Sequence, residues 1–339
     1  MFEGKKVAVV VPCYNEQDQV GKVLDTMPGF VDLVVVVDDA STDSTCEVVR
    51  ERMASSGQAD RTALIELEVN SGVGAAILAG YKEAVRRSMD VVAVMAGDGQ
   101  MAPKQLRMLV EPVATGRADY AKANRLYYRR AWEMMPRRRY LGNAFLSMLT
   151  KIASGYWHVA DSQTGFTAIS REALETADLD EMYPGYGYPN DLLVRLNVFD
   201  MRVMDVPLRP VYNIGEHSKM QLWKVIPKMS WMIYKRFCWR MWRKYVIHDF
   251  HPLVFFYLGG KLLGLAAVVL FIRMIWMWAV TGNIPPINAL TWAFCSISAI
   301  QFSLFAMWFD MERNRSLIPG RAMASGESEE GESDQREQQ

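Results

Sequence analysis

The sequence predicts an α/β domain with a doubly wound sheet, followed by amphipathic interfacial helices and a C-terminal transmembrane helical hairpin. Short β-branched runs alternate with helical segments through the first part of the chain. Basic residues and tryptophans then recur at helical spacing, and two long apolar stretches follow. We expect the α/β domain over residues 1–215, interfacial helices over 216–250, two transmembrane helices over 251–312 and a disordered acidic tail over 313–339.

Composition narrows the class of protein. The chain has 339 residues, a formal net charge of +0 and a pI of about 6.9, so no global basic field indicates nucleic-acid binding. The four cysteines lack metal-ligand or CxxC spacing and are typical of reduced thiols. The N-terminus leads directly into a strand pattern, without the apolar stretch of a signal peptide, and we therefore expect this domain in the cytosol.

The first strands are predicted by apolar, β-branched runs at residues 7–12 and 33–38. Such runs are typical of strands that are buried on both faces of a parallel sheet. Ligands of doubly wound sheets bind at the carboxyl ends of the strands. The remaining elements expected here are helices at 16–27, 44–53 and 73–88 and strands at 63–69 and 91–97.

After about residue 120 the alternation of strands and helices weakens. A basic segment at 125–143 precedes a helix, and the segment ADSQTGFTAISREAL follows at 160–174. A loop rich in glycine, tyrosine and proline comes next, and a strand pattern at 202–208 closes the domain.

The C-terminal part has the pattern of a membrane anchor. Residues 219–248 carry lysines, arginines and tryptophans but no acid, which favours helices lying in a membrane interface. The stretches at 253–280 and 288–309 each exceed the roughly 20 residues needed to cross a bilayer core. Basic residues flank both outer ends, and the positive-inside rule places them in the cytosol. Lys261 could snorkel, pair with another helix or contact a lipid phosphate.

Three motifs follow strands in order: VPCYNE from residue 11, VDDASTD from residue 37 and AGDGQ from residue 96. Together they resemble family 2 glycosyltransferases of the GT-A fold, which read V-P-x-Y-N-E, V-D-D-x-S-x-D and D-x-D-x-Q. The resemblance covers about residues 5–215. NSGVGAA and DSQTGF are similar to the polyprenyl-phosphate hexose synthase branch, which includes dolichol-phosphate mannose and glucose synthases. Several members of that branch carry C-terminal membrane helices.

The third motif implies a divalent metal. A departing nucleotide diphosphate develops negative charge, which Mg²⁺ or Mn²⁺ held by hard oxygen ligands can neutralise. Asp98 and Gln100 stand at the positions of the family's second Asp and its Gln. The first Asp is replaced by Ala96, so the nucleotide phosphates must supply more of the ligands. The alternative is that Asp98 merely caps the GDG turn.

The first two motifs imply the nucleotide pocket. By resemblance, Pro12, Tyr14, Glu16 and Asp39 line the base and ribose. Asn70, with the glycines that follow it, would form a tight turn that approaches the nucleotide. Helix capping remains the alternative for other polar residues of the second motif, and we expect it of Asp43.

Arginines of the basic segment match phosphate-binding positions of the relatives. Arg125 follows the fifth strand, and Arg138 or Arg139 matches a second arginine before the next helix. Guanidinium groups bind phosphate oxygens in bidentate fashion. Relatives also carry R-x-x-G-x-S-K near the domain end; here the arginine is missing, and the retained Ser218 and Lys219 are the expected contacts to the acceptor phosphate.

Two further acids are candidates for the sugar. Asp161 aligns with the acid of D-P-x-S-G-F and is expected to orient the substrate, since an ionised phosphate needs no strong base to attack. Asp191 is the other candidate for sugar hydroxyls. The predicted catalytic set is therefore Asp98, Asp161, Arg125 and Arg139.

The resemblance implies an inverting, metal-dependent hexosyltransferase that moves a hexose or N-acetylhexosamine from a UDP- or GDP-linked sugar to polyprenyl or dolichyl phosphate. The product would be a lipid monophosphosugar. The membrane is an expected partner, and a second copy of the chain is another. Two alternatives stay open: a polysaccharide synthase, whose Q-x-x-R-W motif is missing, and a non-catalytic scaffold, for which Ala96 is an argument.

Overall fold

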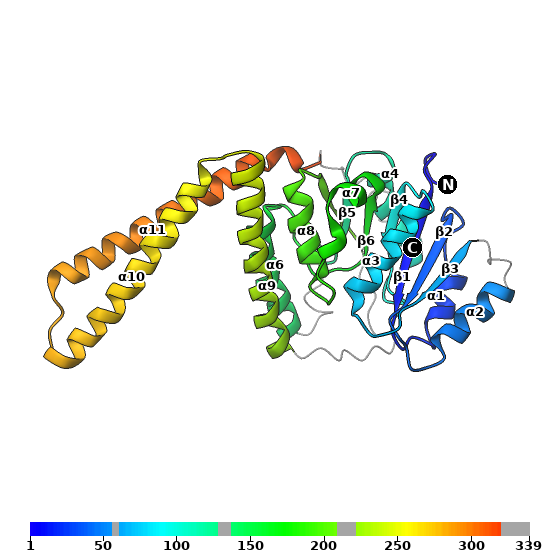
Figure 1. Ribbon diagram of the computed structural model, residues 1–339, viewed down its shortest axis with the longest axis horizontal. Helices are drawn as coiled ribbons and strands as arrows, with labels where there is room; N and C mark the ends of the chain where they lie inside the picture. The colour runs from blue at the N-terminus through cyan, green and yellow to red at the C-terminus, as the bar shows by residue number, and fades with distance from the viewer. Residues whose placement is uncertain (56–60, 128–136, 209–221, 320–339) are drawn as a thin grey trace, which may run out of the picture.

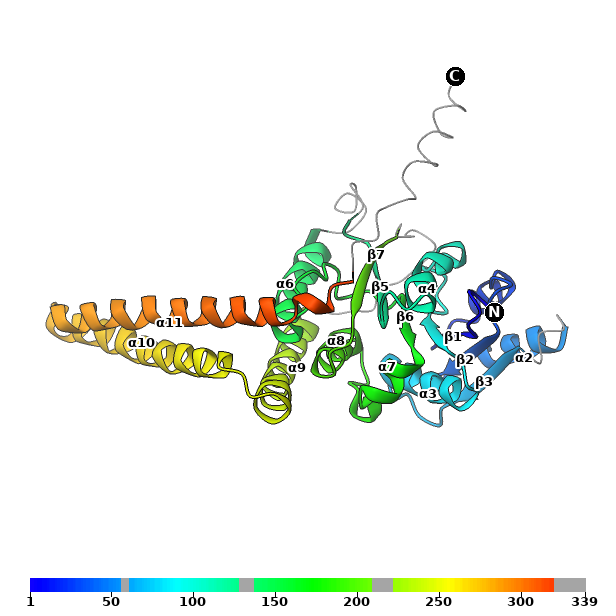
Figure 2. The ribbon, with the colours of Figure 1, turned by 90° about the horizontal axis from the view of Figure 1, so that it is seen from above.

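The computed structural model of the protein describes residues 1–55, 61–127, 137–208 and 222–319. An α/β domain occupies one end of the molecule, and a long helical hairpin extends from it (Figure 1). Two helices that lie across the base of the hairpin separate these two parts (Figures 1 and 2).

The α/β domain is built on one sheet with the strand order β3-β2-β1-β4-β6-β5-β7. Its parallel pairs are β1 with β2 and β4, β2 with β3, and β5 with β7. The predicted α/β class is confirmed. The strands are β1 (Val7–Cys13), β2 (Leu33–Asp38), β3 (Thr62–Glu66), β4 (Val91–Val94), β5 (Tyr120–Asn124), β6 (Thr167–Ser170) and β7 (Val203–Pro207).

Strand β6 is the difference from the expected parallel sheet. It lies between β4 and β5 and is antiparallel to both. The chain leaves β5 at the carboxyl edge, passes through α6 (Arg137–Ser154) and enters β6 from that same edge. Residues that precede β6 therefore lie beside residues that follow the parallel strands.

Helices cover both faces of the sheet, and alternate residues of β1 enter opposite cores. Val9 packs with α1 (Val20–Asp25), α2 (Thr45–Ser55) and α4 (Leu106–Ala114). Val10 packs on the other side with α3 (Val73–Arg86), α7 (Arg171–Thr176) and α8 (Tyr188–Val198). Both valines are fully buried, as the continuous apolar run predicts. Two short 3₁₀ helices also belong to this domain, η1 (Pro103–Gln105) and η2 (Leu179–Glu181).

Helices α6 and α9 (Leu222–Trp242) form a layer between the sheet domain and the hairpin (Figures 1 and 2). Apolar side chains of both helices pack together with Val194 of α8. Both helices run obliquely to the hairpin (Figure 1). A π-helical turn, η3 (Arg243–His248), leads from α9 toward the hairpin.

The hairpin consists of α10 (Leu253–Thr281) and α11 (Pro286–Arg313), and η4 (Arg315–Leu317) follows it. Both long helices are apolar enough and long enough to cross a bilayer. Only 6% and 17% of their most apolar windows is buried, so their large hydrophobic side chains face outward. The helices approach closely, since a Cβ added to Gly260 would lie 2.9 Å from Ser303 Oγ. Lys261 Nζ donates to Tyr234 Oη of α9 at 3.0 Å, which is the helix pairing considered above.

Candidate functional site

The candidate site is the carboxyl edge of the sheet. Strands β1, β2, β4 and β5 run in the same direction, so the segments that follow them lie along one edge. Because β6 runs the opposite way, the segment that precedes it reaches the same edge. The candidate residues along this edge are Tyr14, Glu16, Asp39, Asp98, Gln100, Arg125 and Asp161.

The loop after β1 is fastened to the loop after β2. Asn15 adopts a positive φ of 56°, a conformation that Asn tolerates better than most residues. Its Oδ1 accepts from Thr42 N at 2.8 Å, and its own N–H donates to Ser41 Oγ at 2.9 Å. Pro12, at the end of β1, is buried, whereas Tyr14 is 44% exposed. An exposed ring at the site edge can cover a flat ligand such as a base.

The Asp39 carboxylate organises the loop between β3 and α3. Its backbone N–H donates to Cys13 O at 2.9 Å, and the side chain is buried. Oδ1 accepts from Ser71 N at 2.7 Å and Oδ2 from Gly72 N at 2.8 Å. Asn70 is exposed at the start of this loop. Asp39 therefore holds the turn that carries Asn70.

The glycines of this turn make room for another loop of the protein. Gly72 has a φ of 94°, and a Cβ there would lie 2.7 Å from Pro184 O. A Cβ at Gly74 would collide with Tyr183 O. Pro184 O accepts from Gly74 N at 2.7 Å, which satisfies a backbone donor at the start of α3. The close approach that we expected for a nucleotide is thus made, at these two positions, by the 183–185 loop.

Asp98 and Gln100 lie in a tight turn beside the end of β1. Gly97 N donates to Pro12 O at 3.2 Å, and Gln100 N donates to Asp98 Oδ1 at 3.0 Å. Both side chains are partly buried. Cys13 O, at the end of β1, accepts from Asp39 N. The turn and the Asp39 loop therefore flank the same strand end.

The electrostatics of this edge are shown by the Cys13 thiol. Burial raises its pKa well above the ordinary value, and the negative charges of Glu16, Asp38 and Asp98 raise it further. Carboxylates that follow or end three different strands thus lie close enough to the Cys13 sulfur to raise its pKa. Such an edge attracts a cation.

Arg125 and Asp161 form a bidentate ion pair at the end of β5. Arg125 Nε lies 2.7 Å from Asp161 Oδ2 and Nη2 lies 3.2 Å from Oδ1. Asp161 is 1% exposed, and Arg125 is 20% exposed. Burial alone would raise the pKa of Asp161, but the charge and hydrogen bonds of Arg125 lower it overall. Asp161 is therefore ionised at neutral pH and is a weak base.

Asp191 lies in the first turn of α8, inside the protein. The side chain is fully buried and forms ion pairs with Arg195 at 3.3 Å and with Arg236 at 2.5 Å. Its Oδ2 also accepts from Tyr183 N at 2.7 Å. These contacts give Asp191 a structural role in holding the 183–187 loop, and its contact with a sugar stays a prediction.

Other predicted residues lie outside the described part of the chain. Ser218 and Lys219 belong to this group. The backbone of Arg138 and Arg139 begins α6, but their side chains are outside the described residues as well.

Buried polar residues inside β5 and β7 were not among the predicted candidates. Lys122 is fully buried and its Nζ donates to Thr164 O at 2.5 Å. Asp205 Oδ2 accepts from Ala160 N at 2.7 Å and from Asn124 Nδ2 at 2.9 Å. A charged residue inside an otherwise apolar strand pattern was the available signal.

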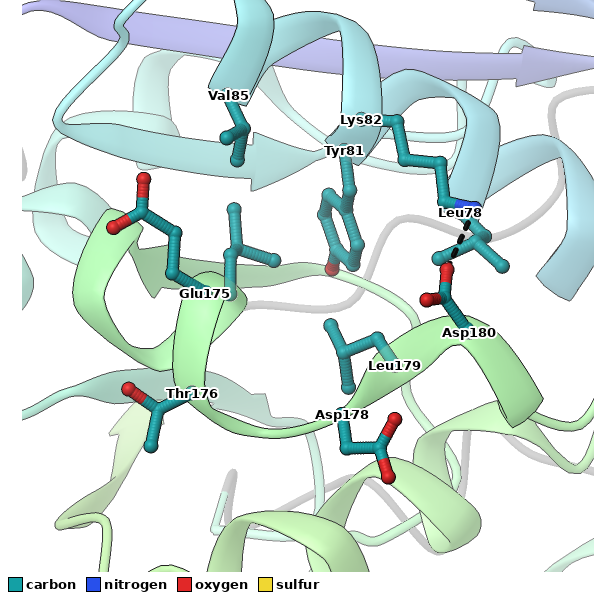
Figure 3. Close-up of a pocket in the computed structure, with 10 residues that line it drawn as sticks. Leu78, Tyr81, Lys82, Val85, Glu175, Thr176, Asp178, Leu179 and Asp180 are labelled. Carbon is teal, nitrogen blue, oxygen red and sulfur yellow. Dashed lines mark ion pairs between the residues drawn. The ribbon is translucent and has the colours of Figure 1, made fainter.

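The structure also has a cavity of about 420 Å³ between α3 and α7 (Figure 3). Lys82 and Asp180 form an ion pair of 2.7 Å across it. None of the predicted site residues lines this cavity. Its α3 residues, Leu78 to Val85, lie in the body of that helix, whereas the start of α3 at Val73 follows the turn held by Asp39.

Comparison with known proteins agrees with this arrangement. Residues 8–177, half of the chain, match glycosyl transferase family 2. The chain belongs to this family. This match covers the three sequence motifs, Arg125 and Asp161.

Two relatives of this glycosyltransferase act on lipid phosphates. The UDP-N-acetylglucosamine–dolichyl-phosphate N-acetylglucosaminyltransferase of Methanococcus voltae is 27% identical over 219 residues, which cover 62% of this chain and 87% of that protein. The polyprenol monophosphomannose synthase of Mycolicibacterium smegmatis is 30% identical over 209 residues, which cover 60% of this chain and 77% of that protein.

The fold is also similar to a solved structure. Glucosyl-3-phosphoglycerate synthase from Mycobacterium tuberculosis, in complex with Mn²⁺, UDP and phosphoglyceric acid, has a TM-score of 0.50 and 22% sequence identity. The similarity covers 70% of this chain and 78% of that one. The sheet of this glycosyltransferase is thus of the GT-A type.

Proposed function

We propose that this glycosyltransferase moves a hexose or N-acetylhexosamine from a UDP- or GDP-linked sugar to a polyprenyl or dolichyl phosphate, with inversion at the anomeric carbon. The observation that carries the proposal is the shared edge of the sheet, where the Asp39 and Asp98 loops flank one strand end. The two relatives described above, which act on lipid phosphates, support the class of acceptor.

The donor would bind between the loops after β1, β2 and β4. Tyr14 is exposed beside Glu16, and the buried Asp39 fixes the turn that carries Asn70. Preformed loops of this kind bind a nucleotide without a large ordering cost.

Asp98 and Gln100 would hold Mg²⁺ or Mn²⁺. A carboxylate and an amide are hard oxygen donors, and the carboxylates around Cys13 favour a cation at this edge. Within the described ranges, no group of three or more acidic, His or Cys side chains could hold a metal by itself. The residues therefore fit an ion that the donor diphosphate helps to ligate. When bound, the ion neutralises the charge on the departing diphosphate.

Arg125 would bind a phosphate of the donor or acceptor. Asp161 holds its guanidinium group by two hydrogen bonds and thereby fixes the plane of that group. The lowered pKa of Asp161, which Arg125 brings about against the effect of burial, makes it a positioning group rather than a base. An ionised lipid phosphate attacks the anomeric carbon directly, and the C–O bond to the diphosphate breaks as the new bond forms. One such displacement inverts the configuration.

The membrane would lie against the layer formed by α6 and α9. Trp231 and Trp242 of α9 are 59% and 61% exposed, and Phe145 and Met148 of α6 are also exposed. Both helices run obliquely to the apolar hairpin rather than along it (Figure 1), which suits helices that lie in an interface beside transmembrane helices. We propose that α10 and α11 span the cell membrane or, in a eukaryote, the endoplasmic reticulum membrane. The catalytic domain and both termini would then be cytosolic.

A panel of UDP- and GDP-sugars tests this proposal on the full chain in lipid nanodiscs. One donor should raise the unfolding temperature when Mg²⁺ is present and should give a lipid monophosphosugar when polyprenyl phosphate is added. If no donor binds and none is transferred, the scaffold alternative is favoured. A polymer formed without lipid phosphate would instead indicate a polysaccharide synthase.

A further inference from the structure

Asp205 lies in β7, and one of its oxygens joins two segments of the candidate site. Oδ2 accepts from the backbone N–H of Ala160 at 2.7 Å and from the side-chain amide of Asn124 at 2.9 Å. Its other oxygen, Oδ1, is buried and has no hydrogen-bond partner among the described residues. The acceptor function of Asp205 is thus concentrated on a single atom.

The two donors to Asp205 stand directly before the two members of the ion pair. Ala160 precedes Asp161, and Asn124 precedes Arg125. The Asn124 side chain also orders the chain after β5, because its Oδ1 accepts from the N–H groups of Leu126 at 3.0 Å and Tyr127 at 3.2 Å. Asp205 Oδ2 therefore sets the distance between the two backbones from which the ion pair extends.

The strand register places a buried lysine opposite this acid. Lys122 of β5 pairs with Asp205 of β7 in the parallel ladder. Its Nζ donates to Thr164 O, in the segment between Asp161 and β6. Lys122 and Asp205 thus approach the same 160–164 segment from neighbouring strands.

We propose that Asp205 is a positioning residue for sugar transfer, which acts through Oδ2 to hold Arg125 and Asp161 in bidentate geometry. This inference rests on the function proposed above. Asp205 does not touch the substrates in this account. Its effect is on the angle and distance of the guanidinium group that meets the phosphate.

The single-atom geometry gives a sharp test. In Asp205→Asn, the amide oxygen can still accept from both donors, and the new NH₂ takes the place of Oδ1. We expect this variant to keep at least about half of the wild-type kcat. Asp205→Ala leaves both donors unsatisfied and should lower kcat about 10- to 100-fold, with the donor KM changed less than about three-fold.

A matched control separates positioning from general strand support. Asp119 ties the same two strands together at their opposite end, since it accepts from Arg202 N at 2.7 Å and from Arg202 Nη2 at 2.9 Å. Asp119→Ala should lower the unfolding temperature about as much as Asp205→Ala does. Its kcat should stay within about two-fold of the wild type.

A double-mutant cycle with Arg125→Met decides whether Asp205 acts through the ion pair. In the Arg125→Met background, adding Asp205→Ala should lower kcat by a further factor of less than about three. Additive losses would overturn the proposal, and so would an Asn variant as slow as the Ala variant.

Hydrogen exchange gives a readout that needs no activity. Amides of residues 125–127 and 160–163 should exchange faster in Asp205→Ala than in the wild type or in Asp205→Asn. Unchanged exchange there would contradict the proposal even if no sugar is transferred. Failure of the wild type to transfer any sugar would instead contradict the proposed function.

Discussion

Arg240 of α9 and Asp310 of α11 form an ion pair in which both side chains are fully buried, with Nη2 2.8 Å from Oδ2. Tyr245 Oη donates to the other oxygen of Asp310 at 2.5 Å. Arg240 Nη1 reaches Asn197 Oδ1, at the end of α8, at 3.0 Å. These contacts fasten the base of the hairpin to the layer of α9 and to the sheet domain.

We predict that Asp310→Ala lowers the free energy of unfolding by about 3–5 kcal/mol, because it leaves the Arg240 charge buried without its partner. The control is Arg313→Ala, which removes an exposed ion pair with Asp249 at 3.3 Å. That change should cost less than about 1 kcal/mol. Thermal unfolding in detergent measures both, and equal shifts in the midpoint would contradict the assigned role of the buried pair.

A second set of contacts joins α9 to the carboxyl edge of the sheet. Arg236 Nε lies 2.5 Å from Asp191 Oδ1. Asp191 Oδ2 accepts from the backbone N–H of the residue before Pro184, and Pro184 O accepts from Gly74 N. Asp39 holds the turn that leads into Gly74. Helix α9 is therefore connected, through the 183–185 loop, to the turn that we propose as part of the donor site.

From this connection we predict that Arg236→Met raises the donor KM about ten-fold, since it removes the charged partner of Asp191, the residue that holds the loop. Lys235→Met removes a neighbouring positive charge that is exposed and lies over the Trp231 ring. It should leave the donor KM unchanged. Steady-state kinetics in anionic nanodiscs compares the two, and similar KM values for both variants would argue against the connection.

Burial raises the pKa of Asp205 to about 7, although the hydrogen bond from Ala160 and the charge of Lys122 oppose this. Between about pH 4 and pH 7 the folded protein keeps a proton that the unfolded chain has lost, so the stabilisation from this group is lost as pH rises through 7. Asp205→Asn removes this titration. Its unfolding temperature relative to the wild type should therefore rise from about pH 5 to about pH 8. A difference that is constant or falls with pH would contradict the assignment.

The loss of the family's first Asp gives a gain-of-function prediction. Ala96→Asp adds a second carboxylate beside Asp98 and should lower the Mg²⁺ concentration for half-maximal transfer about ten-fold. Ala96→Asn has a similar shape without the charge and should have a smaller effect. Metal titrations of the transfer rate measure both changes. An unchanged requirement for metal in Ala96→Asp would place the ion elsewhere.

Much of the sheet could be predicted because buried parallel strands need apolar residues at nearly every position. This holds for β1, β2 and β4, although β4 ends at Val94, earlier than expected. β6 was missed because Thr167–Ser170 is short and lacks a β-branched run. The helix expected at 16–27 begins only at Val20, because the positive φ of Asn15 and the turn after it take up the first residues.

The candidate residues were found more easily than their contacts. Asp39, Asp98 and Arg125 stand at strand ends, where the sequence position indicates their place in the fold. The partners of buried charges are far away in the sequence: Arg125 and Asp161 are 36 residues apart, and Arg240 and Asp310 are 70 apart. Such pairings depend on how the strands and helices pack, which no local pattern contains.

The most direct test of the proposed function compares sugar transfer to polyprenyl phosphate by the wild type, Asp98→Asn and Asp43→Asn. Asp43 is a matched control at the same edge, since it accepts from Thr45 N at the start of α2. We predict Mg²⁺- or Mn²⁺-dependent transfer by the wild type and by Asp43→Asn. In Asp98→Asn, kcat should fall about 10²- to 10³-fold, and added metal should not restore it. Transfer by Asp98→Asn at the wild-type rate, with the same metal dependence, would contradict the account.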